Sequence, residues 1–132
     1  MTLNITERNE IVKYRLERAN RTLREAIGSA EQCFWHTTAN RLYYACFYAV
    51  SALLIKNGYT AHTHNGTFSM FGKHFVSAGL INVEQNKFYR RVLELRQIGD
   101  YDDFVEYSAD DILPIIEPAK IFIATIENLI KS

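Results

Sequence analysis

The chain has 132 residues, of which 48% are hydrophobic and 13% aromatic, enough to bury one core, and this excludes a mainly disordered protein. Fifteen Lys and Arg balance fifteen Asp and Glu, so the sequence lacks the overall positive charge of a dedicated duplex-DNA binder. The uncharged apolar stretch at residues 42–55 is too short to cross a bilayer, and no signal-peptide pattern stands at the N-terminus. We therefore expect a single domain over residues 1–132, in the cytoplasm, with no membrane partner.

More than a hundred residues precede the first proline, and no strand-like alternation interrupts them, so the sequence predicts an all-α fold. Apolar residues at steps of four and three predict an amphipathic N-terminal helix that ends around residues 28–30. A second helix, about 34–57, is apolar around most of its circumference and should stop at Gly58. We expect this second helix to be the central one.

A short helix is expected over about 66–78, after a loop, and a fourth helix over about 83–98, ended by Gly99. Ser108 should cap the last helix, with Asp111 three residues on, and the two prolines threaten its early turns. The simplest architecture is an up-and-down four- or five-helix bundle.

The sequence predicts neither a metal site nor a cofactor. No His stands three residues after a Glu, which excludes the di-iron bundle pattern. Cys33 and Cys46 are not at zinc spacing and should be reduced, small apolar core residues, while His62 and His64 would supply only two ligands. Glycine-rich phosphate loops need a strand before the helix, which an all-helical chain lacks.

Charge is unevenly distributed along the chain. Residues 32–99 carry seven basic and two acidic side chains, whereas residues 100–132 carry two and eight. Solvated helix faces explain such a pattern, and a basic groove for phosphate is the alternative.

Arg96, Asp100 and Tyr101 form the most prominent candidate site. Arg96 and Asp100 are four residues apart, so their side chains can meet on one helix face, with Tyr101 just past the helix end. This arrangement is either a clamp that ends the helix or an Arg held ready for a phosphate or a transition state.

Two further groups are candidates for ligand binding. Asn40 and Arg41, with Tyr44 one turn on, lie on the apolar central helix, where a charged Arg needs a partner or a water-lined cleft. A link to the Asp100 region is the structural alternative. His64 before the short helix, followed by Lys73, could mark an anion site at a helix start or act as a loop or capping residue.

Three motifs follow one another along the chain: Asn40-Arg41-Leu42-Tyr43-Tyr44-Ala45, His64-Asn65-Gly66 leading to Phe71-Gly72-Lys73-His74-Phe75-Val76, and Leu95-Arg96-Gln97-Ile98-Gly99-Asp100-Tyr101. In order and spacing they resemble the HEPN domain family, in particular its small single-domain proteins of the UPF0332 type. The resemblance covers about residues 8–130. It implies a four- or five-helix bundle, usually a homodimer, commonly encoded beside a minimal nucleotidyltransferase in a toxin–antitoxin module. Many family members cleave RNA.

In the ribonuclease members, the resemblance implies an Arg and a His with four to six residues between them, placed at the dimer cleft. Arg96 occupies the Arg position, whereas Tyr101, Asp102 and Asp103 stand where the His would fall. Neither an ionised Asp nor an ordinary Tyr replaces that His well in proton transfer near neutral pH.

The favoured hypothesis is therefore a dimeric binding module for a nucleotide, RNA or a nucleotidyltransferase-type antitoxin, using Arg96, Asp100 and Tyr101 with Arg41 nearby. One alternative is a metal-independent ribonuclease toxin, in which Arg96 stabilises the phosphorane and Asp100 or Tyr101 assists proton movement. The other alternative is a non-catalytic helical scaffold, in which the only role of Arg96 is to hold the helix bundle together.

Overall fold

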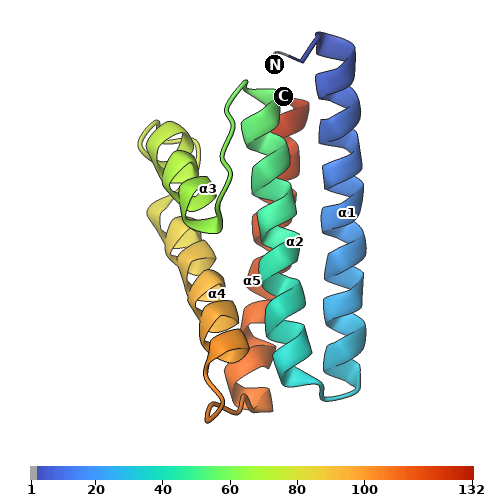
Figure 1. Ribbon diagram of the computed structural model, residues 1–132, viewed down its shortest axis with the longest axis vertical. Helices are drawn as coiled ribbons and strands as arrows, with labels where there is room; N and C mark the ends of the chain where they lie inside the picture. Colours follow the sequence, from blue (N-terminus) through green and yellow to red (C-terminus); the bar gives the residue numbers. More distant parts are fainter. Residues whose placement is uncertain (1–2) are drawn as a thin grey trace.

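The computed structural model describes residues 3–132, which form an all-α up-and-down bundle without strands (Figure 1). The helices are α1 (Ile5–Glu31), α2 (Trp35–Lys56), α3 (His64–Phe71), α4 (Val83–Tyr101) and α5 (Ala109–Lys131), and a π-helical turn, η1 (Gly72–Val76), continues α3. The predicted fold class is confirmed.

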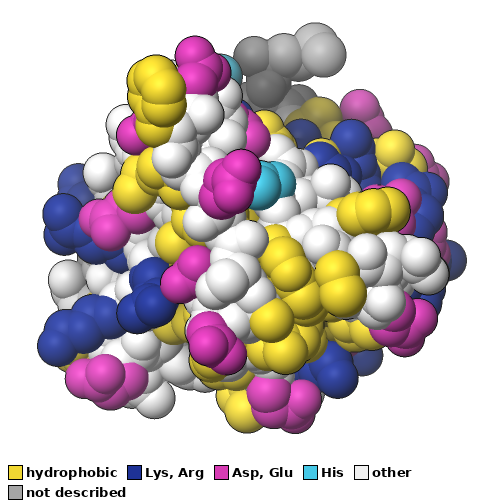
Figure 2. All heavy atoms as spheres, turned by 90° about the horizontal axis from the view of Figure 1, so that it is seen from below, with side chains coloured by type: hydrophobic (Ala, Val, Ile, Leu, Met, Phe, Trp, Pro, Cys, Tyr) yellow, Lys and Arg dark blue, Asp and Glu magenta, His cyan; other side chains and the backbone are white. Residues whose placement is uncertain are grey.

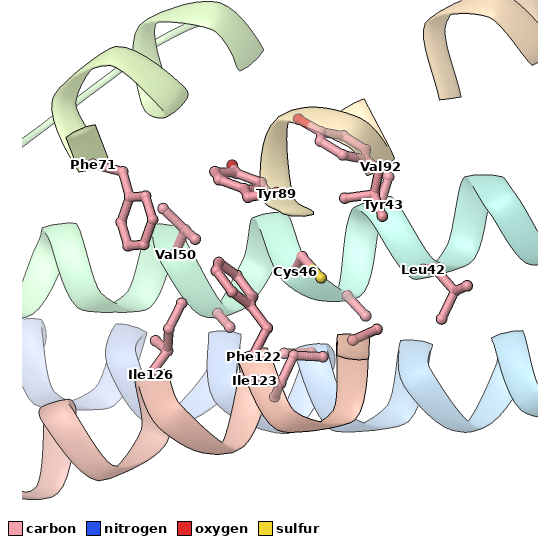
Figure 3. Packing of buried hydrophobic residues seen from close by; sticks show 14 of the residues in the cluster. Leu42, Tyr43, Cys46, Val50, Phe71, Tyr89, Val92, Phe122, Ile123 and Ile126 are labelled. Atoms are coloured by element: carbon pink, nitrogen blue, oxygen red, sulfur yellow. The ribbon is translucent and has the colours of Figure 1, made fainter. Parts of the chain in front are cut away.

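Helix α2 is the centre of the bundle, as its apolar circumference predicts. It contacts each of the other four α-helices, and Figure 1 shows it in front of α5, between α1 on one side and α4 on the other. Figure 3 shows its core side chains meeting Phe71 of α3, Tyr89 of α4 and Phe122 of α5. The buried residues of α2 are Thr38, Ala39, Leu42, Tyr43, Ala45, Cys46, Ala49, Val50, Ser51, Ala52, Leu53 and Leu54.

Side-chain caps fix where α3, α4 and α5 begin. Ser108 and Asp111 form the predicted capping box of α5, with the Ser108 N–H donating to Asp111 Oδ2 over 2.9 Å. Asn82 accepts from the Gln85 N–H at the start of α4. Thr63 Oγ1 accepts from the Gly66 N–H at 2.8 Å, so α3 begins at His64, two residues before the predicted start.

The prediction that α4 ends at Gly99 is wrong, because α4 continues to Tyr101. Instead, the absence of a side chain at Gly99 lets Tyr107 and His36 pack close to the backbone of α4. A Cβ at this position would lie 3.0 Å from Tyr107 Cε2 and 3.5 Å from His36 Nδ1. Asp100 and Tyr101 therefore belong to the last turn of a regular helix rather than to the loop after it.

Two other local expectations need correction. Pro114 and Pro118 do not interrupt α5; both are exposed, so the backbone carbonyls that lose a helical partner can be hydrated. Cys46 is buried as expected, but Cys33 is exposed and adopts φ 61° in the α1–α2 connection. Helix α1 also runs one residue past the predicted range, to Glu31.

Across residues 3–132, every helix is either too short or too polar to cross a bilayer.

Candidate functional site

Arg96 lies on the inner face of α4, where Asp100, Tyr44 and several aromatic rings contact it. Its side chain is only 11% exposed, and its Nε lies 3.0 Å from Asp100 Oδ2, which confirms the ion pair that the spacing predicts. The Nε–H does not meet the geometry of a hydrogen bond with this carboxylate and is buried without another acceptor. Nη2 donates to the Tyr44 hydroxyl at 3.2 Å, whereas Nη1 is not buried and donates to no group among residues 3–132. One end of the guanidinium is thus anchored, and the other is free.

Aromatic rings form the platform under this guanidinium. Its central carbon lies 5.7 Å from the Tyr43 ring, 5.4 Å from Tyr44 and 5.9 Å from Tyr101, all within cation–π range. Tyr43 is fully buried, whereas Tyr101 is 77% exposed. The three rings therefore extend from the core to the solvent beside Arg96. Their contacts fix the position of the guanidinium charge.

Asn40 and Arg41 join the same cluster from α2. Asn40 Nδ2 donates to Asp100 Oδ2 at 3.4 Å, which is the structural link to the Asp100 region that the sequence left open. Arg41 donates from Nε and Nη2 to Asn40 Oδ1, at 3.0 and 2.7 Å, and its guanidinium lies 5.1 Å from the Tyr44 ring. Arg41 Nη1 is also 3.8 Å from Glu25 of α1. Glu25 thus partly balances the charge of Arg41, which leaves this guanidinium less available for a phosphate than one without an acidic neighbour.

His64 reaches the cluster from the start of α3. Its Nδ1 lies 2.6 Å from the Tyr43 hydroxyl, and its ring packs 4.7 Å from Phe47 and 5.6 Å from Tyr44. Burial, and secondly the positive charge of Arg96, lower the pKa of His64. The imidazole is therefore neutral near pH 7.

The contact with Tyr43 also decides which nitrogen of His64 carries the proton. Burial, as the largest cause, raises the pKa of Tyr43, so its hydroxyl stays protonated. That buried proton has Nδ1, 2.6 Å away, as its acceptor, because the hydrogen bond with Tyr89 lowers the pKa of Tyr43, as a bond that Tyr43 accepts would. The neutral ring consequently carries its own proton on Nε2, where no described group accepts it.

Lys73 lies apart from these residues. It is exposed on η1, roughly 13 Å further along the helical segment than His64, and no hydrogen bond or ion pair joins it to the cluster. In the described part of the chain there is no group of three His, Cys, Asp or Glu that could hold a metal ion, so His62 and His64 gain no third ligand.

The α4–α5 connection closes the lower end of the site. Tyr107 donates from its hydroxyl to the Leu95 carbonyl at 2.6 Å, and its ring stacks on His36 at 4.8 Å. Figure 2 shows this end of the molecule, where acidic, basic and hydrophobic side chains lie side by side on the surface. The connection itself carries three exposed acidic residues and one exposed aromatic residue: Asp102, Asp103, Glu106 and Phe104. An anionic ligand would be repelled here, so its favourable approach to Arg96 is along the face of α2.

Sequence reasoning missed Tyr43 and Phe47 as parts of the site and treated them as core residues. Both do pack against the core, but Tyr43 also orients His64, and Phe47 supports its ring. The available signal was the Tyr43 hydroxyl, which lies on an otherwise apolar, buried helix. A buried hydroxyl needs a hydrogen-bond partner. The partner, 21 residues away, could be identified only from the fold.

Four cavities of about 460, 390, 320 and 200 Å³ lie elsewhere, and Arg96 lines none of them. They lie between α1 and α5, beside residues 33–37 with Tyr107, between α4 and α5, and beside Arg15 with the α2–α3 connection. None of these four cavities therefore includes the cluster around Arg96.

Comparison with known proteins places this geometry in a family. The family model described as HEPN domain matches residues 12–129. A UPF0332 protein of Thermotoga maritima is 37% identical and covers 96% of each chain. A Methanocaldococcus jannaschii protein named "Putative toxin MJ0142" is 28% identical over 82% of this chain and 74% of its own.

One solved structure supports the fold alone. The crystal structure of TT1696 from Thermus thermophilus is similar with a TM-score of 0.75 at 16% identity, covering 89% of this chain and 96% of that one. The bundle, the matched family model and the UPF0332 relatives agree, and the chain belongs to the HEPN domain family, as a protein of the UPF0332 type.

Proposed function

We propose that this protein binds a phosphate-bearing ligand, a nucleotide or RNA, at the cluster around Arg96. The observation that supports this most is a pair of unused donors on one aromatic platform. Arg96 Nη1 and His64 Nε2 both lack an acceptor within residues 3–132, and both side chains stand on Tyr43 and Tyr44. A fixed guanidinium beside a neutral imidazole N–H suits an oxyanion, and the neighbouring Tyr101 offers an exposed ring for a base.

The proposal includes the biological setting. We propose that the chain acts as a homodimer within a two-gene toxin–antitoxin module, with a minimal nucleotidyltransferase as its partner. The family match and the relative named as a toxin support this setting. The acidic connection after α4, where Phe104 is 97% exposed, is the surface we assign to the partner protein, because large exposed apolar side chains rimmed by charge favour association.

Titration of His64 tests ligand binding directly. A phosphodiester beside His64 and Arg96 would favour the imidazolium, so binding of the dinucleotide UpU is expected to raise the pKa of His64. The affinity should then increase as the pH falls through the interval between the free and the bound pKa. Proton NMR of the imidazole, recorded against pH with and without UpU, measures both effects.

The exposed His62, two residues away, is the internal control, since its signals should not follow the dinucleotide. A His64 titration curve that is identical at zero and saturating UpU would contradict the proposed site. Sedimentation of the purified chain, alone and mixed with the proposed nucleotidyltransferase partner, tests the dimer and the partner.

A metal-independent ribonuclease is the second candidate function, and one observation favours it. His64 of α3 lies near enough to Arg96 for the positive charge of Arg96 to lower the pKa of His64, so it is the imidazole that could stand in for the His missing from the motif after Arg96. The tautomer argues against a base, however, because the nitrogen that faces away from Tyr43 carries a proton and has no lone pair to accept one. We therefore expect no cleavage of total tRNA by the purified protein with chelator present. Cleavage by the native chain, but not by Arg96→Ala, would establish the ribonuclease instead.

A further inference from the structure

A second group of basic side chains, on α1, lies beside a later part of α2, away from Arg96. Arg15 of α1 donates to Ser51 Oγ of α2, and Ser51 is only 7% exposed. The two residues line a cavity of about 200 Å³, together with the α2–α3 connection. The other lining residues are Leu54, Ile55, Tyr59, Thr60, Ala61, His62 and Thr67, none of which is acidic.

The charge of Arg15 is not balanced within the chain. Burial, and secondly the like charge of Arg18, lower the pKa of Arg15. None of the ion pairs within residues 3–132 includes Arg15 or Arg18. A half-buried cation next to another cation is unfavourable unless an anion joins them. Such a pair beside a polar cavity is therefore typical of an anion site.

Two tyrosines connect this cavity to the cluster around Arg96. The Arg18 guanidinium lies 4.4 Å from the Tyr48 ring, and the Tyr48 ring is 5.9 Å from that of Tyr44. Tyr44 in turn accepts the hydrogen bond from Arg96. Tyr44, Tyr48 and Ser51 lie on one face of α2, and the rise of a helix puts the two basic sites on the order of 10 Å apart.

We propose that the Arg15–Ser51 cavity binds one phosphate group of a single-stranded oligonucleotide whose next bound phosphate lies at Arg96. The inference rests on the proposed function and names its ligand more closely. The cavity is smaller than the roughly 300–1,000 Å³ of sites for whole small molecules, so it fits one oxyanion group rather than a nucleotide. Half-buried tyrosines between two cationic sites match the stacking platforms of single-strand binders, with Tyr44 and Tyr48 under successive bases.

The test compares a long and a short ligand. Fluorescence anisotropy gives the affinities of labelled uridine hexamers, RNA and DNA, and competition gives that of UpU, which has a single phosphate. We expect Arg15→Gln combined with Arg18→Gln to weaken hexamer binding by about tenfold or more and to leave UpU binding unchanged. The slope of log K against log salt for the hexamer should also become shallower by about 0.7 for each phosphate that the variant no longer neutralises.

Matched variants separate this effect from folding. Arg18→Gln alone alters an exposed side chain whose one described cation–π contact is with the Tyr48 ring, and Arg24→Gln removes the same charge from the side of α1 that faces α5. We expect a weaker hexamer complex and a shallower slope from Arg18→Gln, and native values from Arg24→Gln.

Any of the following three results would overturn the inference. Native hexamer affinity and slope in the double variant, with binding lost in Arg96→Ala, would leave the proposed function standing without the second site. Arg15-dependent binding of a hexaglutamate peptide in place of the oligonucleotides would assign the cavity to an acidic protein. No binding of UpU or either hexamer to the native chain would overturn the inference and the proposed function together.

Discussion

Replacing Arg96 by Ala is expected to lower the affinity for UpU by about 10- to 100-fold, because the hydrogen bonding of Nη1 to a charged phosphate contributes roughly 1.5–3 kcal/mol. Arg96→Lys keeps the charge but loses the planar guanidinium that Tyr43 and Tyr44 support, so its affinity should lie between those of the native and Ala proteins. Isothermal titration with UpU, at a temperature where circular dichroism shows each variant folded, measures the loss.

Arg90→Ala is the matched control for this prediction. Arg90 also lies on α4 and also pairs with an acid four residues on, Glu94, but its side chain is 68% exposed and far more solvated than that of Arg96. We expect native affinity from this variant. If Arg96→Ala lowered only the melting temperature and bound UpU like the native chain, Arg96 would be a structural lock and the scaffold hypothesis would hold.

Phe122→Ala is expected to have the largest effect on stability, a loss of about 3–5 kcal/mol in the free energy of unfolding. Phe122 of α5 is 1% exposed, and its ring lies 5.8 Å from Phe71 and 5.4 Å from Tyr89. Truncation would leave a cavity where α3, α4 and α5 meet the central helix. Since domains of this size are stable by only about 5–15 kcal/mol, urea unfolding should show a clearly lower midpoint.

Ile121→Ala tests whether this loss comes from burial. Ile121 is the preceding residue of the same helix and is 55% exposed, so its truncation should change the free energy of unfolding by only about 0.5 kcal/mol. Equal midpoints for the two variants would mean that α5 is rotated relative to the arrangement described above.

The features that sequence predicted best are those set by a long, regular pattern. The apolar circumference of α2 predicted its central position, and the spacing of Ser108 and Asp111 predicted the start of α5. Both depend on residues close together in the chain, where helix periodicity and capping chemistry act directly.

The failures came from contacts between distant segments. Gly99 resembles a helix terminator, but its missing side chain makes room for Tyr107 and His36, so the helix continues past it. His64 resembles a loop residue until α3 packs on α2 and brings it to Tyr43. Local propensity cannot reveal either role, because each depends on a residue more than seven positions away.

The different environments of the two cysteines offer a practical route to the assembly. Cys46 is fully buried, and burial raises its pKa, whereas Cys33 is exposed in the connection between α1 and α2. A maleimide or a nitroxide reagent should therefore modify Cys33 alone in the folded protein, without any engineered residue. In a homodimer, the two spin labels would report one distance between equivalent points, from which the relative placement of the copies could be determined in solution.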